Sequence, residues 1–240
     1  MSKYLIEKNT SLEIDNLSFS EDIYEFELEE NAHLTYITFD NGEKDAKNVV
    51  KANLKKDSHL EIYNVVTSAK SSNVDQQITL LESGANVQIM NLFLMVDEAV
   101  LDSNIEIFHL DKHTESDLSN YAIAKNNAKI VMSNNATIKQ GCSGSIAHQQ
   151  AKGLTLSEAS KIKALPNLFI DEYDVIANHA CAIGSINKED LFYLMSRGLS
   201  LDEASKIVVM GYVQPILDKI TNKDIKEIVE KSFVNKLLSK

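Results

Sequence analysis

The pattern that decides the fold first appears as NAHLTYI at Asn31–Ile37 and returns as DSHLEIY at Asp57–Tyr63. In each copy a small or turn-forming residue is followed by polar and apolar residues that largely alternate, which is the period of a β-strand. Three more copies follow, as GANVQIM at Gly84–Met90, DSNIEIF at Asp102–Phe108 and NNAKIVM at Asn126–Met132. Most of the chain is therefore predicted to consist of short strands.

These copies recur at a nearly regular distance. The residues just before the first apolar position of each copy are His33, His59, Asn86, Asn104 and Lys129, at spacings of 26, 27, 18 and 25 residues. Recurrence on this scale is typical of a stacked-coil solenoid. We expect a mainly β fold, a parallel β-helix from about residue 10 to 184, within a core of residues 1–186. On periodicity alone, an antiparallel β-sandwich of the same short strands remains an alternative.

Residues 187–240 change to a helical period. Asn187 can cap a helix over Lys188–Ser196 that ends at Gly198. Ser200-Leu201-Asp202-Glu203 is a capping box that opens a second helix, and a third follows Thr221. Because a solenoid exposes its last coil, we expect this C-terminal helical region to cap the open end of the β-helix.

Charge and cysteine content narrow the class of protein. The formal net charge is −11, which disfavours binding to nucleic acid or to an anionic membrane, since both need a cationic face. The longest apolar runs, such as Leu92–Val96, are too short for a membrane span, and Met1–Glu7 lacks the design of a signal peptide. Cys142 and Cys181 cannot form a disulfide framework, so a reducing cytoplasm is expected.

His179 and Cys181 are the best candidates for a metal site. They lie two residues apart in a segment with strand character, so both side chains should project from one face, about 6.6 Å apart. An imidazole and a thiolate at that distance could share one soft metal ion or neighbouring irons of a cluster. A packed histidine beside a small apolar thiol is the alternative.

Other chemical motifs are weaker. His109 and His113 have a spacing that suits a metal ion only on a helix face, and their segment lacks helical character. Cys142 stands in a turn-rich stretch without further ligands. The sequence contains no glycine-rich phosphate loop, no Gly-x-Ser-x-Gly elbow and no CxxC pair. We therefore expect that the chain itself does not hydrolyse nucleotide.

A signature in the last third of the chain carries the strongest functional signal. It runs LPNLFI at Leu165–Ile170, DVIANHA at Asp174–Ala180, GSI at Gly184–Ile186 and LFYLMSRGL at Leu191–Leu199. Its order and spacing resemble the C-terminal core of the SufB/SufD family, the scaffold proteins of the SUF iron–sulfur cluster assembly system. The resemblance is dense over about residues 154–218. It implies a right-handed parallel β-helix and disfavours the β-sandwich alternative.

The resemblance also implies partners and a site. Family members form scaffold dimers through the β-helix and dock an ABC-type ATPase, SufC, through C-terminal helices. His179 falls on the family's characteristic histidine, which is implicated in cluster assembly at the interface between scaffolds. Phe192 or Tyr193 could instead belong to the core of the helical cap. The docking surface would lie within Lys188–Gly211, around Leu191, Phe192, Tyr193, Met195, Arg197 and Gly198.

Departures from the family pattern are informative as well. SufB-type members carry a glutamate directly after the histidine, where this chain has Ala180. They also carry an essential cysteine shortly before a Phe-Pro pair of the preceding coil. Leu165-Pro166 matches that pair, which places Ser160 near the position of the cysteine. The resemblance is thus to SufD more than to SufB, and to a short form without the N-terminal helical region. His109, Thr114 and Ser116 match a structural turn of the family.

The resemblance implies a scaffold that is not an enzyme and carries an iron–sulfur cluster transiently, with none tightly bound in the isolated chain. Its partner would be a second copy or a SufB-type chain. Two alternatives stay open. One is a β-helical carbohydrate-active enzyme, although the acidic residues are scattered along the sequence. The other is a structural pseudo-scaffold that dimerises and binds no metal, which Ser160 and Ala180 favour.

Overall fold

The chain folds into a parallel β-helix with two sheets. The structure, a computed structural model, describes residues 2–16, 23–42 and 44–238, and the strands found there alternate between two seven-stranded sheets. The odd sheet contains β1 (Ser2–Ile6), β3 (Ile23–Leu28), β5 (Ala46–Leu54), β7 (Ser72–Leu80), β9 (Val100–His109), β11 (Lys129–Ile138) and β13 (Lys161–Ile170). The even sheet contains β2 (Ser11–Asn16), β4 (His33–Asp40), β6 (His59–Ser68), β8 (Asn86–Met95), β10 (Glu115–Ala124), β12 (Ser145–Thr155) and β14 (Val175–Ser185).

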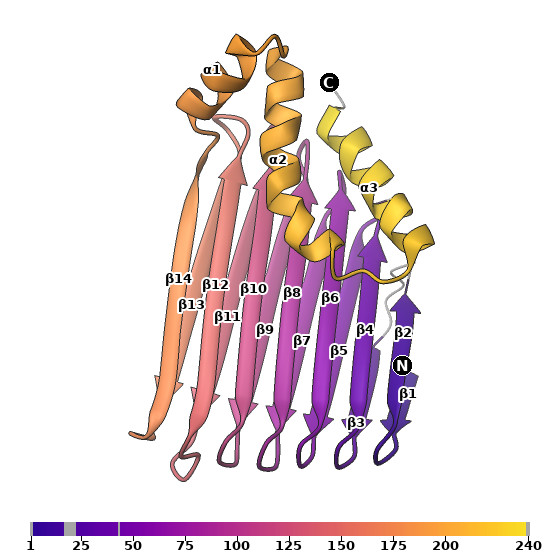
Figure 1. The fold of residues 1–240 in the computed structure, drawn as a ribbon, viewed down its shortest axis with the longest axis vertical. Coiled ribbons are helices and arrows are strands. Elements are labelled where there is room, and N and C mark those ends of the chain that lie inside the picture. The colour runs from indigo at the N-terminus through magenta and orange to yellow at the C-terminus, as the bar shows by residue number, and fades with distance from the viewer. Residues whose placement is uncertain (1, 17–22, 43, 239–240) are drawn as a thin grey trace.

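All the strand pairs within these residues are parallel, which confirms the β-helix and rules out the sandwich. In Figure 1 the chain runs upward along the even strands in front and downward along the odd strands behind. Successive coils advance from right to left, so the coil is right-handed. The irregular spacing of 18 residues between Asn86 and Asn104 also finds its explanation here. Asn86 begins β8 in the even sheet, whereas Asn104 lies within β9 in the odd sheet.

The turns from odd to even strands stack on one edge of the coil. Asn9, Asn31, Asp57, Gly84, His113 and Gly144 occupy equivalent places in these turns, and all have a positive φ. Asn31 N donates to Lys56 O at 2.9 Å and Asp57 N donates to Ser83 O at 3.1 Å, so each turn bonds to the next coil. A Cβ at Gly84 would collide with the carboxylate of Asp57, so any other residue here would force that side chain to move.

The lumen combines an apolar core with a ladder of buried amides. Tyr36, Ile62 and Ile89 stack at paired positions of the even sheet and are fully buried. Two residues further along, Asn64, Asn91 and Asn120 occupy successive coils. Asn91 Nδ2 donates to Asn120 Oδ1 at 2.6 Å, and Asn120 Nδ2 donates to Asn134 Oδ1 across the lumen at 3.0 Å. Stacked amides of this kind bond only when the coils are in register.

Three helices follow the last strand: α1 (Lys188–Ser196), α2 (Leu201–Leu217) and α3 (Lys223–Leu238). Helices α2 and α3 lie along the outer face of the even sheet (Figure 1). Ser232 on α3 shares a hydrogen bond of 2.6 Å with Thr67 on β6, and Lys125 donates to Leu237 O at 2.8 Å. None of the helices in the described part of the chain is long and apolar enough to cross a membrane.

The expectation that these helices cap the open end of the β-helix is wrong for α2 and α3. The reason is visible in the run Leu92–Val96 on and after β8, which is buried on both faces of its sheet. Its outer face needs apolar cover, and Val209, Val213 and Phe233 supply it within one cluster. In the described part of the chain, α2 and α3 therefore lie over the even sheet and not over the last coil (Figure 1).

Candidate functional site

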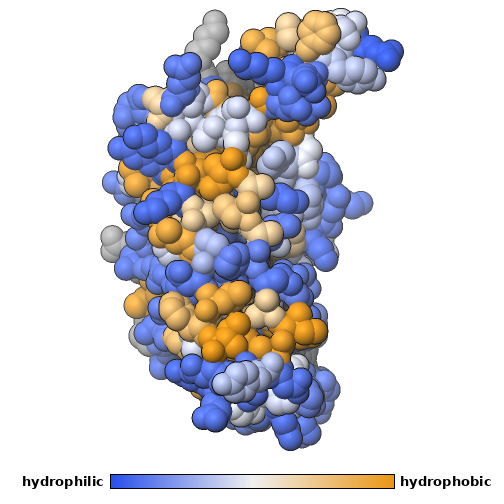
Figure 2. All heavy atoms as spheres, turned by 90° about the vertical axis from the view of Figure 1, so that its left-hand side faces the viewer, coloured by the Kyte–Doolittle hydropathy of each residue, from blue (hydrophilic) through white to orange (hydrophobic). Residues whose placement is uncertain are grey.

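The last coil forms an open, partly apolar end of the solenoid. Within the described residues, β13 pairs only with β11 and β14 only with β12, so each ends its sheet. Ile176 on β14 is 59% exposed and Phe169 on β13 is 55% exposed. Figure 2 looks onto this end and shows apolar patches separated by polar side chains. Exposed edge strands with apolar side chains are a template for pairing with another chain.

His179 lies on β14 in a column of side chains that runs along the lumen. Its paired position on β12 is Gln149, and the column continues with Leu118 and Ile89, which are buried. Because paired residues of parallel strands face the same side, His179 projects on the lumen side of the coil, where no later strand covers it. The imidazole is therefore exposed at the end of an otherwise closed interior.

Gln149 is a neighbour of His179 that sequence reasoning missed. It is buried, its Nε2 donates to Asn167 O at 3.3 Å, and its Oε1 has no hydrogen-bond partner in the protein. The signal in the sequence was the spacing of 30 residues, which is one coil at this end of the solenoid. It could be recognised only once the register was known.

Cys181 shares the strand and the face of His179. Both residues lie within β14, as the sequence predicted, and Cys181 pairs with Ala151 of the preceding coil. Its thiol is free and exposed. Among the described residues, no third histidine, cysteine or carboxylate completes a ligand set with these two. One imidazole and one thiolate can hold a metal ion only if another molecule supplies further ligands.

The second cysteine and Ser160 have structural environments. Cys142 is fully buried, its Sγ donates to His109 O at 3.3 Å, and burial raises the pKa of its thiol. The hydroxyl of Ser160 donates to Ser157 O at 2.7 Å and closes the turn before β13. Neither residue offers a group to a ligand at the open end.

His109 and His113 do not form a metal site. His109 Nδ1 lies 2.8 Å from Thr114 Oγ1, and its Nε2 lies 2.9 Å from Ser116 Oγ. Burial lowers the pKa of His109 to about 4, so the ring is neutral at physiological pH. His113 instead occupies a left-handed turn with a φ of 56°. The structural turn implied by the resemblance is confirmed.

Helix α1 presents an apolar face that the fold does not use. No residue of α1 is buried, and its most extensive contacts are to α2. Phe192 is 75% exposed and Tyr193 is 58% exposed, so the alternative that one of them belongs to a core is wrong. Met195, Arg197 and Gly198 are exposed as well, whereas Leu191 is half-buried.

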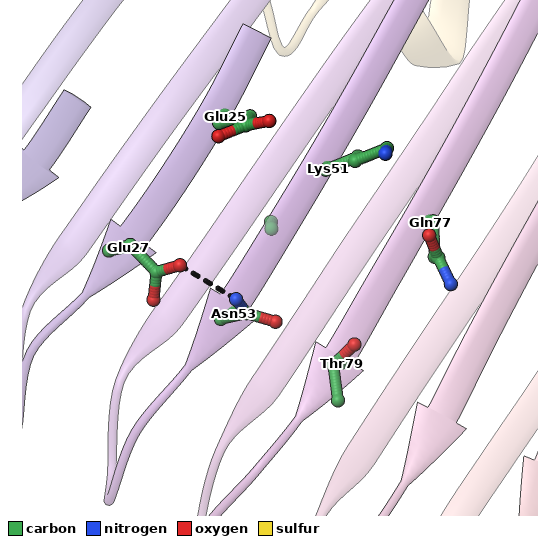
Figure 3. A pocket seen from close by; sticks show the side chains of 7 residues that line it. Glu25, Glu27, Lys51, Asn53, Gln77 and Thr79 are labelled. Atoms are coloured by element: carbon green, nitrogen blue, oxygen red, sulfur yellow. Dashed lines mark hydrogen bonds between the residues drawn. The ribbon is translucent and has the colours of Figure 1, made fainter. Parts of the chain in front are cut away.

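A polar groove on the outer face of the odd sheet bears on the carbohydrate-active alternative (Figure 3). Glu25 and Glu27 project from the same face of β3. Each is engaged by a neighbouring coil, because Lys3 Nζ lies 2.6 Å from Glu25 and Asn53 Nδ2 donates to Glu27 at 2.7 Å. A catalytic acid must hold a proton, which an ion pair with lysine disfavours. The groove gives that alternative no support.

Comparisons with known proteins agree with the geometry. The family model described as "SUF system FeS cluster assembly, SufBD core domain" matches residues 2–212. "Iron-sulfur cluster assembly protein SufD" of Bacillus subtilis (strain 168) is 33% identical over 122 residues, 51% of this chain and 28% of that protein. An "Iron-sulfur cluster assembly SufBD family protein" of Staphylococcus aureus (strain MRSA252) is 23% identical over 221 residues, 91% of this chain and 48% of that protein.

This chain spans less than half the length of either relative. The match to the family model runs from β1 into α2 and therefore includes the two-sheet coil and helix α1. The chain belongs to the SufBD core family of the SUF iron–sulfur cluster assembly system.

Proposed function

We propose that this chain is a SufD-like scaffold that holds an iron–sulfur cluster transiently, in the cytoplasm, and catalyses no reaction itself. The observation that carries the proposal is the exposed His179 on the uncovered last coil. The cluster is cargo in this proposal, so the isolated chain should hold none tightly. Cys181 is a second ligand on the same face.

A second scaffold chain completes the site. The free edges of β13 and β14 and the exposed side chains of Phe169 and Ile176 favour pairing of this end with another β-helix. His179 and Cys181 provide two donors, and the facing chain would supply the remaining ligands. The partner is a second copy of this chain or a SufB-type chain that carries the cysteine that Ser160 replaces here.

A SufC-type ATPase docks on the other exposed surface. Helix α1 offers Phe192, Tyr193 and Met195 to solvent, and Arg197 lies at its end. Since α1 leads directly from β14 into α2, a movement of the docked ATPase would be transmitted to the strand that carries His179. ATP-driven motion would then open or close the scaffold interface around the cluster.

Anaerobic reconstitution with iron, sulfide, the partner scaffold and the ATPase tests the proposal. We expect wild-type protein to acquire a labile cluster and His179→Ala to lose most of the loading or transfer to an acceptor. Cys181→Ser should lower loading further if the thiolate is a ligand. Asn178→Ala is the matched control, because Asn178 neighbours His179 on β14 and faces the opposite side.

The same experiment separates the scaffold from the pseudo-scaffold, which would dimerise without ever taking up iron. Wild-type loading by the His179→Ala protein would overturn the role of this histidine. Loss of folding in His179→Ala, measured by circular dichroism, would favour a packing role, although its exposure argues against one.

A further inference from the structure

Two histidines and a glutamate meet on the outer face of the even sheet, away from the open end. His33 begins β4 and His59 begins β6, and the two occupy paired positions in adjacent coils. Their rings meet edge to face, with 4.8 Å between the centroids. Glu61 follows His59 by two residues and faces the same side. One ligand atom from each of the three residues lies within 4.8 Å of the others.

The distances suit ligands of one ion better than an ordinary ion pair. His33 Nε2 lies 3.5 Å from Glu61 Oε2, and His59 Nε2 lies 3.7 Å from Glu61 Oε1. A charge-assisted hydrogen bond would be about 2.7–2.9 Å long. Neighbouring nitrogen and oxygen ligands of a tetrahedral zinc ion are separated by roughly 3.3–3.5 Å, from bonds of about 2.0–2.2 Å. The two separations between histidine and glutamate, each to a different carboxylate oxygen, are close to that spacing.

A second observation points to an absent partner for His33. Its Nε2 is shielded from solvent and makes no hydrogen bond within the protein. Buried polar atoms are almost always paired, and an unpaired one calls for a bound ion or water. A neutral imidazole with its proton on Nδ1 would direct the free electron pair of Nε2 at the same point as the carboxylate.

The surroundings hold Glu61 in place as an anionic ligand. Thr35 Oγ1 donates to Glu61 Oε2 at 3.0 Å, and Thr35 lies directly beside Glu61 in the paired register. Burial by itself would raise the pKa of Glu61, but hydrogen bonds from Thr35 and Tyr63 favour the charged carboxylate, and the pKa is lowered. Outer hydrogen bonds that orient a ligand are typical of metal sites.

We propose that His33, His59 and Glu61 form a mononuclear site for a divalent first-row transition-metal ion, Zn²⁺ or Fe²⁺. Two imidazoles and one carboxylate are the shared ligand set of open zinc sites and of mononuclear Fe²⁺ sites, in which solvent fills the remaining positions. The half-exposed side chains leave room for such solvent.

This site is independent of the scaffold proposal. Four strand spacings separate β6 from β14, which is roughly 19 Å. The ion would join two successive coils near the N-terminal end of the solenoid, and it would stabilise the folded chain because it binds only where both coils are stacked. Sequence reasoning used His33 and His59 only as markers of the repeat, although their spacing of one coil is what stacks them.

The test uses the full chain with His179→Ala and Cys181→Ser, so that the open end contributes no ligands. After treatment with a chelator, the protein is titrated calorimetrically with Zn²⁺ and, under anaerobic conditions, with Fe²⁺. We expect one ion per chain and a higher Tm in the presence of the ion. His33→Ala, His59→Ala and Glu61→Gln should each weaken binding by about tenfold or more. His148→Ala is the matched control, a histidine on β12 that should leave binding unchanged.

Each outcome decides the proposal. Uptake of Zn²⁺ alone identifies a zinc site, and uptake of Fe²⁺ as well identifies a general divalent site that can hold iron. Absence of binding of either ion at concentrations up to about 100 µM would overturn the proposal. Unchanged affinity in the His33→Ala/His59→Ala protein would overturn it too. If that double variant does not fold, His33→Asn/His59→Asn replaces it.

Discussion

The guanidinium group of Arg197 lies over the ring of Tyr193, with 5.3 Å between Cζ and the ring centroid. Its Nη2 also donates to the Tyr193 hydroxyl at 3.4 Å. This contact links the residue that ends α1 to the exposed face of the same helix. A planar cation held over an aromatic ring beside Phe192 is the kind of surface that carries binding energy in protein interfaces.

The first prediction is that Arg197→Ala with Phe192→Ala weakens the association with a SufC-type ATPase about tenfold or more, because these side chains would be central to the contact. Stability should change by less than about 0.5 kcal/mol, since α1 buries no residue. Ile228→Ala, an exposed apolar residue on α3, is the control. Calorimetry with the purified ATPase measures the effect, and unchanged affinity in the folded double variant would rule out this surface.

The second prediction is that the chain expressed alone forms a dimer through its last coil. Ile176→Glu with Phe169→Glu should shift the protein to monomer, because each copy would bring like charges to the same interface. Leu5→Glu is the matched control at the opposite end of the solenoid, where Leu5 is also exposed. Light scattering at micromolar concentration distinguishes the cases.

Two results would contradict a dimer interface at the last coil. Dissociation caused by Leu5→Glu but not by the variant of the last coil would move the interface to the N-terminal end. A monomeric wild-type chain would exclude the homodimer and leave an obligate SufB-type partner as the required second scaffold.

The strands could be predicted from the sequence because alternation is a local property. The residues of Asn31–Ile37 show their period without reference to the rest of the chain, and β4 begins where that pattern indicates. The position of the helices could not be obtained in this way. It depends on which sheet face needs cover, and the signal for this lies in runs that are apolar on both faces of the sheet, such as Leu92–Val96 and residues 121–124.

In the candidate site too, local features could be predicted from the sequence, whereas contacts between coils could not. His179 and Cys181 were placed on one strand face by local spacing, and the structure has them there. Gln149 beneath His179 and the group of His33, His59 and Glu61 depend on contacts between coils. Coil length changes along the chain, so such contacts follow from the register and cannot be read from a fixed period.

The third prediction concerns the stability of the fold at acidic pH. Burial lowers the pKa of His109 to about 4, whereas an unfolded histidine titrates near 6.5. Between these values the unfolded chain binds the proton and the folded chain does not, so stability is complete above about pH 6.5 and falls as the pH approaches 4. The loss attributable to His109 is at most roughly 3 kcal/mol.

Denaturation in urea at several pH values measures this dependence. His109→Gln should be less stable at neutral pH, because Thr114 and Ser116 lose their partner, but it should show a shallower decline between pH 6.5 and 4. His148→Gln is the control and should keep the slope of the wild-type protein. An identical slope in His109→Gln would show that other groups cause the acid sensitivity.

The last prediction concerns the amide ladder inside the coil. Asn120 accepts from Asn91 and donates to Asn134, so it links neighbouring coils of the even sheet and the two sheets to each other. Asn120→Leu would leave a buried donor on Asn91 and a buried acceptor on Asn134 unpaired, at a cost of about 2–4 kcal/mol. Ser119→Ala, the adjacent position on the outer face of β10, should change stability by less than about 0.5 kcal/mol. Urea unfolding measures both variants. If Asn120→Leu lowered the free energy of unfolding by less than about 1 kcal/mol, the apolar packing of the leucine would compensate for the lost hydrogen bonds, and the ladder would not be needed for stability.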